Sequence, residues 1–291
     1  MSKSDSSHDQ RVKMHELSSR TNFRVCDVFR DSQKSVPLIT FEDHRCTLIA
    51  LYHAMKSGVL SPESPPDLIR FDLHDDGKSP KSGVERLKPF IGCSPTLREF
   101  QDFVEWELSP MDDDWVKVAL ELGLVRNVVT FGSEKCDSFP KGRTPYKDHR
   151  DGVHECWTLS HLWHLFGYQG DLSDLARRGQ LATLWETLQW NGQGFLPLER
   201  ALIVDIDLDC FTQKADGQTI ALPSDILEAR FENVDTSGDS YHRPRAFLFE
   251  LMRRSSFITG FSGIRLCFRD RSSDSANHQT GTNSRLIMWT R

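Results

Sequence analysis

The sequence predicts an α/β protein: a single domain with a mainly parallel sheet and helices covering both faces. Short apolar runs of strand length alternate with longer helical patterns along the 291 residues. Apolar residues make up 38% of the chain and aromatic residues 10%, which is ordinary for a protein with a packed core. Strands that alternate with helices favour a parallel sheet, because each crossover helix packs on one of its faces.

The first half of the chain supplies three of the predicted strands. VPLITFED, residues 36–43, indicates a buried strand that runs into acidic residues, and 46–58 predicts a helix that Gly58 closes. LIRFDLH, residues 68–74, predicts the second strand, and NVVTFG, residues 127–132, the third.

Between the second and third strands we expect a long loop and two helices. Residues 77–95 are rich in Gly, Pro, Ser and Lys, which is typical of a loop, and long loops of this kind are often functional. Helical patterns follow over 96–108 and 112–124.

The second half begins with an irregular stretch, residues 133–156, which has few apolar anchors. ALIVDIDLDCF is the most strand-like run of the chain, apolar at its start and acidic at its end. The predicted elements after the irregular stretch are helices near 157–166 and 180–190, a strand over 201–211, a helix over 242–256 and a last strand over 256–261.

These patterns predict three parts of the chain. Residues 1–20 are polar and predict a disordered arm. Residues 21–262 form the predicted folded domain, and 263–291 a polar tail whose order is left open.

Composition excludes several classes of protein. The net charge of −6 and the pI near 6.0 come without a dense Lys/Arg stripe, so nucleic acid is not expected as a partner. No apolar run is long enough to span a membrane, and the N-terminus lacks a secretory signal. Seven cysteines without a CxxC pair fit reduced thiols. We therefore expect a soluble, cytoplasmic protein, with its oligomeric state left open.

Three of the predicted strands end in the same kind of charged residue. Ligands gather outside the carboxyl ends of parallel strands, so we expect these side chains to converge if the strands are neighbours. Carboxylates packed closely repel one another unless a cation lies among them. The six candidate metal ligands are His44, Asp72, His74, Asp76, Asp205 and Asp207.

The ligand types narrow the choice of metal. The set is rich in oxygen, has two imidazoles and has no clustered thiolate, which suits Mn²⁺, or Zn²⁺ and Fe²⁺ less selectively. Six ligands are too many for one closed tetrahedral site. Two ions about 3.5 to 4 Å apart would use them well and would activate a water for attack on a planar carbon. The pattern therefore predicts a hydrolase.

The same residues resemble a known family. DLHDD at 72–76 resembles the DxHxD signature of the ureohydrolase (arginase/deacetylase) superfamily, and DID at 205–207 its later DxD. FEDH at 41–44 and VDIDLDCF at 204–211 are similar to the peptide arginase family, whose members convert arginine residues of ribosomally made peptides to ornithine. The resemblance implies an arginase/deacetylase-like fold, two Mn²⁺ ions held by the six ligands, and bridging roles for Asp72 and Asp205.

The resemblance also implies two catalytic roles beyond the ligands. Arginases place a proton-shuttling histidine after the first acidic block, but here no histidine follows His74 until His149. His149 and His154, both in the irregular stretch, are the candidates for this role. Glu250 is the candidate for the late glutamate that faces the guanidinium of the substrate.

The predicted function is hydrolysis of an arginine residue in a peptide to ornithine and urea. Acidic residues suit such a cationic substrate, and the long polar segments 77–95 and 133–156 suit the walls of an open groove. A deacetylase or another amidohydrolase on the same metal centre is one alternative. A metal-stabilised binding protein without turnover is the other, and the missing shuttle histidine near His74 is the feature that would favour it.

Overall fold

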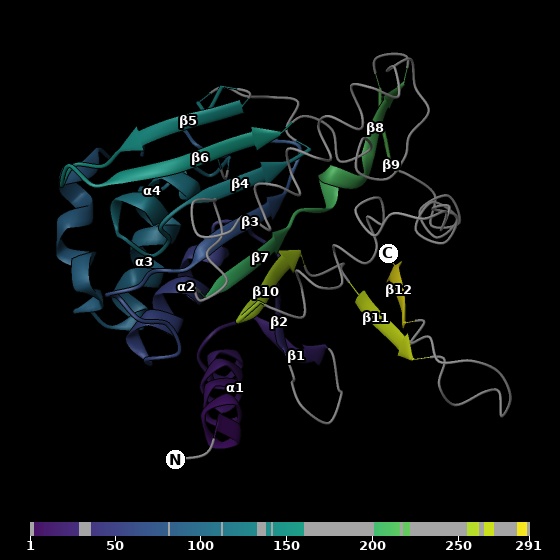
Figure 1. The fold of residues 1–291 in the computed structure, drawn as a ribbon. Helices are drawn as coiled ribbons and strands as arrows, with labels where there is room; N and C mark the ends of the chain where they lie inside the picture. The colour runs from purple at the N-terminus through teal and green to yellow at the C-terminus, as the bar shows by residue number, and fades with distance from the viewer. Residues whose placement is uncertain are drawn as a thin grey trace, which may run out of the picture.

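A computed structural model shows an α/β architecture built on an eight-stranded mixed sheet (Figure 1). The predicted α/β class is confirmed. The structure describes residues 3–28, 36–80, 82–111, 113–132, 138–140, 142–159, 201–215, 218–221, 255–261, 265–270 and 284–289.

The strand order in the sheet is β1-β2-β10-β7-β3-β4-β6-β5. The six central strands are parallel to one another, and the edge strands β1 and β5 pair with them antiparallel. The bounds are β1 Arg24–Val28, β2 Val36–Phe41, β3 Asp67–Phe71, β4 Val128–Phe131, β5 Gly142–Lys147, β6 Val153–Leu159, β7 Leu202–Ile206 and β10 Phe257–Phe261.

The central strands were predictable because they are buried on both faces. Every residue of β2, β3, β4 and β7 is buried, which explains why these strands are near-continuous apolar runs in the sequence. The β7 strand lies between β3 and β10, and β2 pairs with the other side of β10. The carboxyl ends of the three strands that end in the candidate ligands therefore lie along the same edge of the sheet.

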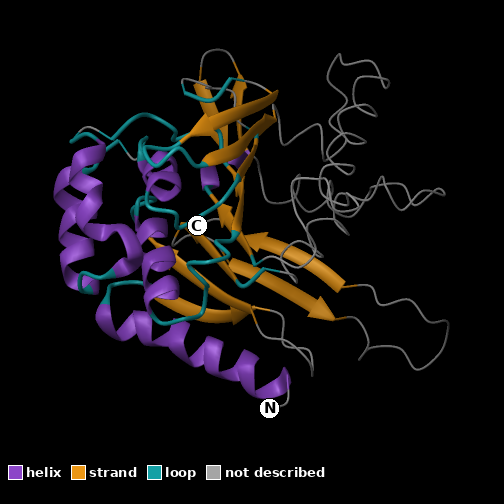
Figure 2. Ribbon diagram, turned by 60° about the vertical axis from the view of Figure 1, so that its left-hand side comes forward, coloured by secondary structure: helices purple, strands orange, loops and turns teal. Residues whose placement is uncertain are grey.

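The described α-helices lie on one side of the sheet (Figure 2). The helices predicted near 157–166, 180–190 and 242–256 lie mostly or wholly outside the described residues, so coverage of the second face stays a prediction. Residues 157–159, at the start of the first of these, belong to β6 instead. Within the described part, no helix has the length and apolar character needed to cross a membrane. The helices are α1 Lys3–Arg20, α2 Cys46–Lys56, α3 Leu97–Glu107 and α4 Trp115–Glu121, with 3₁₀ helices η1 Val84–Cys93 and η2 Leu208–Phe211.

Helix α2 forms the centre of the helical layer. All of its residues from Thr47 to Met55 are buried, and the Tyr52 ring stacks on Phe100 of α3 with centroids 4.0 Å apart. Gly58 follows the helix with a φ of 73°, a left-handed conformation that favours glycine. The predicted end of this helix is confirmed.

The prediction of a disordered arm over 1–20 was wrong, because residues 3–20 form α1. Met14 and Leu17, one helical turn apart, are fully buried. The carbonyl of Lys13 lies 2.8 Å from Nε2 of His53 in α2. Packing against distant parts of the chain, rather than local composition, therefore orders this segment.

Three other segments contain regular elements that were not predicted. The loop over 77–95 contains η1, and the irregular stretch 133–156 contains β5 and most of β6. Strand β5 alternates between exposed and half-buried residues and therefore lacks an apolar run. Within the predicted tail 263–291, β11 Arg265–Asp270 pairs with β12 Ser284–Trp289; a smaller hairpin joins β8 Thr212–Ala215 to β9 Gln218–Ala221.

Candidate metal centre

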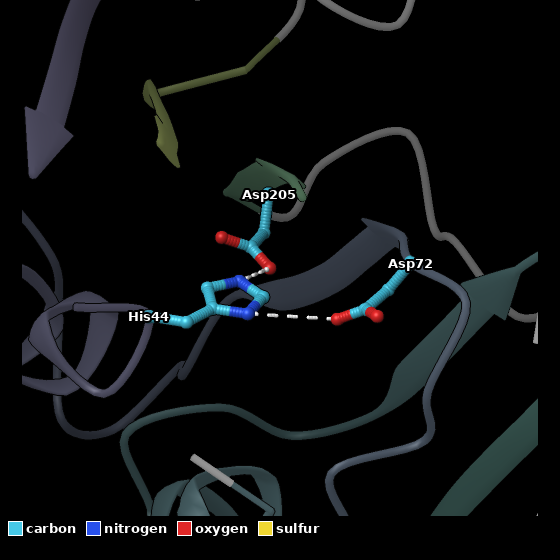
Figure 3. Close-up of side chains that lie close together, drawn as sticks. All are labelled: His44, Asp72 and Asp205. Atoms are coloured by element: carbon cyan, nitrogen blue, oxygen red, sulfur yellow. Dashed lines mark hydrogen bonds and ion pairs between the residues drawn. The ribbon is translucent and has the colours of Figure 1, made fainter. Parts of the chain in front are cut away.

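The side chains that follow β2, β3 and β7 meet at the carboxyl edge of the sheet (Figure 3). His44 lies in the turn between β2 and α2, where Asp43 accepts a hydrogen bond from the Arg45 backbone N–H at 2.9 Å. Asp72 directly follows β3, and Asp205 lies near the end of β7. The predicted convergence of three strand ends is confirmed.

His44, Asp72 and Asp205 form a buried set, here named the inner group, that could hold a metal ion. His44 Nε2 lies 2.8 Å from Asp205 Oδ2, and His44 Nδ1 lies 3.6 Å from Asp72 Oδ2 (Figure 3). The other oxygen of Asp205 accepts hydrogen bonds from the hydroxyls of Thr47 at 3.1 Å and Thr259 at 2.8 Å. Asp205 is therefore fixed by residues of α2 and β10 as well as by its own strand.

Asp72, His74 and Asp209 form a second set that could hold a metal, here named the outer group. His74 Nδ1 lies 2.8 Å from Asp209 Oδ2 and 3.8 Å from Asp72 Oδ1. The side chain of His74 is 41% exposed and that of Asp209 27%, so this group lies nearer the solvent. Asp209 was not among the predicted ligands, although it continues the alternation of Asp205 and Asp207.

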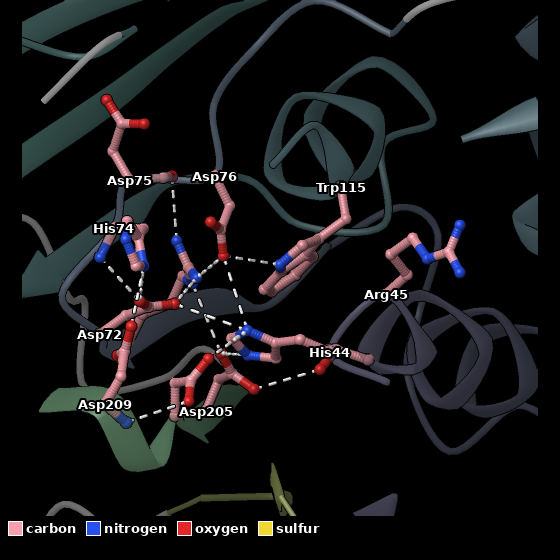
Figure 4. A network of polar contacts seen from close by, with 12 residues as sticks. His44, Arg45, Asp72, His74, Asp75, Asp76, Trp115, Asp205 and Asp209 are labelled. Atoms are coloured by element: carbon pink, nitrogen blue, oxygen red, sulfur yellow. Dashed lines mark hydrogen bonds and ion pairs between the residues drawn. The ribbon is translucent and has the colours of Figure 1, made fainter. Parts of the chain in front are cut away.

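Asp207 and Asp76, the remaining predicted ligands, also face the inner group. Asp207 Oδ2 lies 3.1 Å from His44 Nδ1, and Asp76 Oδ2 lies 3.5 Å from the same nitrogen. Trp115 of α4 donates a hydrogen bond from its indole nitrogen to Asp76 Oδ2 at 3.0 Å (Figure 4). Asp76 has a φ of 43°, a left-handed conformation that is uncommon for a residue other than glycine.

The neighbouring Asp75 does not belong to the cluster. Its carboxylate points away from the other acids (Figure 4) and accepts hydrogen bonds from the backbone N–H groups of Ser138 and Phe139 at 2.8 and 2.9 Å. It therefore secures the loop after β3. Gly77 follows, and a Cβ there would lie 2.2 Å from the Phe139 ring, so close packing requires glycine at this position.

Arg70 is the cluster residue that sequence reasoning missed. It lies in β3, is fully buried, and contacts the carboxylates of Asp72 and Asp76 through the same nitrogen, Nη2. Its guanidinium also lies over the Trp115 ring, 4.7 Å from the centroid. The one signal in the sequence is a charged residue inside an otherwise apolar buried strand, two positions before Asp72 and so on the same face.

The cluster perturbs the pKa of its members. Burial alone would lower the pKa of His44, but the carboxylates of Asp205, Asp207 and Asp72 together outweigh it and raise that pKa well above its usual value. Burial raises the pKa of Asp207, but the hydrogen bond and charge of His44, the Asp209 backbone N–H and Arg70 together outweigh this and lower it to about 2. Burial, and then the nearby Asp76, raise the pKa of Asp72 well above its usual value. The surrounding carboxylates therefore favour the protonated form of His44.

The donor set fits divalent metal ions. Among the described residues, the carboxylates of the cluster meet one guanidinium and two imidazoles, so acidic groups outnumber cationic ones. Oxygen and imidazole ligands suit Mn²⁺. The inner and outer groups share Asp72, whose Oδ2 faces His44 and whose Oδ1 faces His74. One carboxylate could thus serve two neighbouring ions.

The structure does not bring the predicted catalytic histidines to this cluster. Strand β6 is parallel to β4 and β3, and Leu159 at its end is in register with Phe131 and Phe71 at the ends of those strands. The start of β6 therefore lies at the amino ends of the parallel strands, opposite the cluster. His154 lies at the start of β6, and His149 lies in the turn before it. The expected proximity of either histidine to the metal ligands is therefore not found, because both belong to the β5–β6 hairpin, which was not predicted.

Both histidines have partners in this hairpin region. His149 contacts the carboxylate of Glu121 at the end of α4 through Nδ1, and its backbone N–H donates to the same carboxylate at 3.0 Å. His154 Nε2 lies 3.2 Å from Asp148 Oδ2. These contacts hold the turn against α4. Glu250, the candidate late glutamate, lies outside the described residues.

A comparison with protein-family models finds no match for the chain, and a comparison with curated proteins finds none either. The fold and site define the chain as an α/β protein with a buried histidine and carboxylate cluster at the carboxyl edge of a largely parallel sheet.

Proposed function

We propose that the protein is a metal-dependent hydrolase of the ureohydrolase type, with an arginase/deacetylase-like fold. The observation that carries this proposal is the pair of candidate metal-binding groups that share Asp72. A shared carboxylate between two sets of oxygen and imidazole ligands is what a centre with two neighbouring ions requires. The largely parallel sheet, with these ligands at its carboxyl edge, supports the same class.

The ions would be Mn²⁺, two per chain. His44, Asp72 and Asp205 would hold one, and Asp72, His74 and Asp209 the other, with Asp76 and Asp207 adjacent to the inner group. When bound, such ions supply a water activated for attack on a planar carbon.

The protein's own residues would orient this centre. The hydroxyls of Thr47 and Thr259 fix one oxygen of Asp205 and leave Oδ2 directed at His44. Burial of the inner group keeps bulk water from it, which strengthens electrostatic interactions there. The excess of carboxylates favours a cationic substrate. These features suit the guanidinium of an arginine residue.

The proposed substrate is an arginine within a peptide, and the products are ornithine and urea. The test is urea release, with Mn²⁺ present, from an arginine-containing peptide and from free L-arginine at matched concentration. Higher kcat/KM for the peptide is expected, because contacts with the rest of the peptide would add binding energy. Equal or better hydrolysis of free arginine would reject the peptide assignment, and acetate release from an acetylated peptide would instead indicate a deacetylase.

A metal-stabilised binding protein without turnover is the second candidate. The observation that favours it is that neither His149 nor His154, the two predicted proton shuttles, lies near the cluster. Stoichiometric Mn²⁺ binding without urea or acetate release would support this candidate over the hydrolase.

A further inference from the structure

The guanidinium of Arg70 lies inside the carboxylate cluster. Its Nη2 atom contacts Oδ2 of both Asp72 and Asp76, and its Nε lies 3.4 Å from Asp205 Oδ2. Its Nη1 donates a hydrogen bond to the backbone carbonyl of Asp75 at 3.0 Å. A buried arginine is permanently charged and presents its donors in a rigid plane, so this position places a fixed positive charge among the acids.

Arg70 contacts the same oxygens that the inner group would offer to a metal. Asp72 Oδ2 is the oxygen that faces His44, and Asp205 Oδ2 is the oxygen 2.8 Å from His44 Nε2. The oxygen of Asp72 that faces His74 is Oδ1, which is not the atom that Arg70 contacts. The guanidinium therefore acts directly on the inner group and only indirectly on the outer group.

We propose that Arg70 is a built-in counter-cation of the inner group. Without metal it balances Asp72, Asp76 and Asp205, and with metal it competes for the oxygens of Asp72 and Asp205. The inner group consequently binds its ion with lower affinity than the outer group binds the other ion. The inference rests on the proposed function for the existence of a metal centre, and it adds how the two ions differ.

Arg70 is held in place independently of the carboxylates. The Trp115 ring lies against the guanidinium and the Asp75 carbonyl accepts from it, so the charge stays near the inner group after an ion arrives. Two cations that share ligand oxygens repel each other strongly in a buried site. The ion in the inner group therefore binds against this repulsion.

The test measures Mn²⁺ binding to the metal-free full-length protein by the electron paramagnetic resonance signal of free Mn²⁺. Asp209→Asn removes a ligand of the outer group and so isolates the inner group. In that background, Arg70→Met should bind Mn²⁺ tighter by more than about tenfold, because a neighbouring positive charge is removed. Arg45→Met is the matched control, since Arg45 is also buried and next to His44 but pairs with Asp43. It should leave the affinity unchanged.

Unchanged Mn²⁺ affinity in Arg70→Met would overturn the inference. If Arg70→Met folds only with Mn²⁺, the metal replaces the missing charge and the inference is supported. If it does not fold at all, Arg70→Gln decides: glutamine removes the charge but keeps a side-chain hydrogen-bond donor for the carboxylates. Tighter Mn²⁺ binding by Arg70→Gln than by the parent with Arg70 supports the inference, and equal binding overturns it.

The same titrations separate this inference from the proposed function. Wild-type protein with two equally tight ions, unchanged by the Arg70 substitution, would contradict the inference alone. Mn²⁺ binding only after Arg70 is replaced would support the inference and contradict the hydrolase proposal. Absence of binding in every variant would contradict both.

Discussion

His44 and Asp205 are 161 positions apart in the chain, yet His44 Nε2 lies 2.8 Å from Asp205 Oδ2. The contact joins the turn after β2 to the end of β7, two strands that are separated in the sheet by β10. Thr259 of the intervening strand β10 donates a hydrogen bond from its hydroxyl to the same aspartate at 2.8 Å. Three strands thus support one buried carboxylate, and the predictions below follow from this arrangement.

Asp205→Asn should abolish Mn²⁺ binding to the inner group and lower the free energy of unfolding of the metal-free protein by about 3–5 kcal/mol. The asparagine removes a buried negative charge that pairs with His44 and Arg70. Equilibrium dialysis and urea unfolding measure the two effects.

Asp75→Asn is the control for this metal-binding measurement, because it lies in the same acidic stretch but its carboxylate faces away from the cluster. It should retain wild-type Mn²⁺ binding. Equal loss of binding in Asp75→Asn and Asp205→Asn would mean that the ligands are assigned wrongly.

Mn²⁺ affinity should rise with pH and binding should release protons. The pKa values of His44 and Asp72 are both raised in the metal-free protein, and each group must lose its proton to become a ligand. The raised His44 pKa stabilises the metal-free fold below its unfolded pKa, and this stabilisation is lost as pH rises through the folded value. Calorimetric titration at about pH 6 and about pH 8, in two buffers of different ionisation enthalpy, measures both effects. Affinity independent of pH would contradict this prediction.

Glu121→Gln should destabilise the protein by about 1–3 kcal/mol at neutral pH and by less in acid. Burial would raise the pKa of Glu121, but hydrogen bonds from the Tyr146 hydroxyl and the His149 backbone outweigh it and lower that pKa. A lowered carboxylate pKa contributes stability above its unfolded value of 4.5, and this contribution is lost as pH falls through the folded value.

Urea unfolding across this acidic range gives the measurement for Glu121. Glu155→Gln is the control, because that glutamate pairs with exposed Arg143 at the surface and should contribute little. If the wild-type protein remains more stable than Glu121→Gln by the same free energy at low pH, the predicted contribution of the lowered Glu121 pKa is contradicted. Mn²⁺ binding should not change in Glu121→Gln, since the carboxylate lies at the opposite edge of the sheet from the cluster.

Leu17→Ala should lower the free energy of unfolding by about 2–5 kcal/mol, because Leu17 is fully buried where α1 packs on the domain. Val12→Ala in the same helix is the control, since Val12 is 43% exposed. Urea unfolding compares the two. Equal and small effects would mean that α1 is not part of the folded domain.

The parts of the fold that could be predicted are those that one local pattern determines. The strands near 36–43, 68–74, 127–132 and 201–211 are buried on both faces and therefore read as apolar runs. Helix α1 could not be predicted in this way, because its order depends on contacts with α2 and β1.

The candidate site was predictable to a similar extent. Its six expected ligands follow strands that end at one edge, so knowledge of the strands was enough to bring them together. Arg70 was missed because a single arginine in LIRF does not change the strand pattern. His149 and His154 were misplaced because the β5–β6 hairpin was not predicted: β5 alternates between exposed and half-buried residues and has no apolar run. This hairpin places both histidines at the amino ends of the parallel strands, away from the cluster.

The most direct measurement is the Mn²⁺ content of the full-length protein after removal of metals and reconstitution with excess Mn²⁺. Inductively coupled plasma mass spectrometry gives ions per chain, and His44→Ala serves as the variant that lacks an inner ligand. We predict about two ions per wild-type chain and about one in His44→Ala, because the two candidate groups share Asp72 but not His44. No bound Mn²⁺ in the folded wild-type protein would contradict the metal centre and the hydrolase proposal with it.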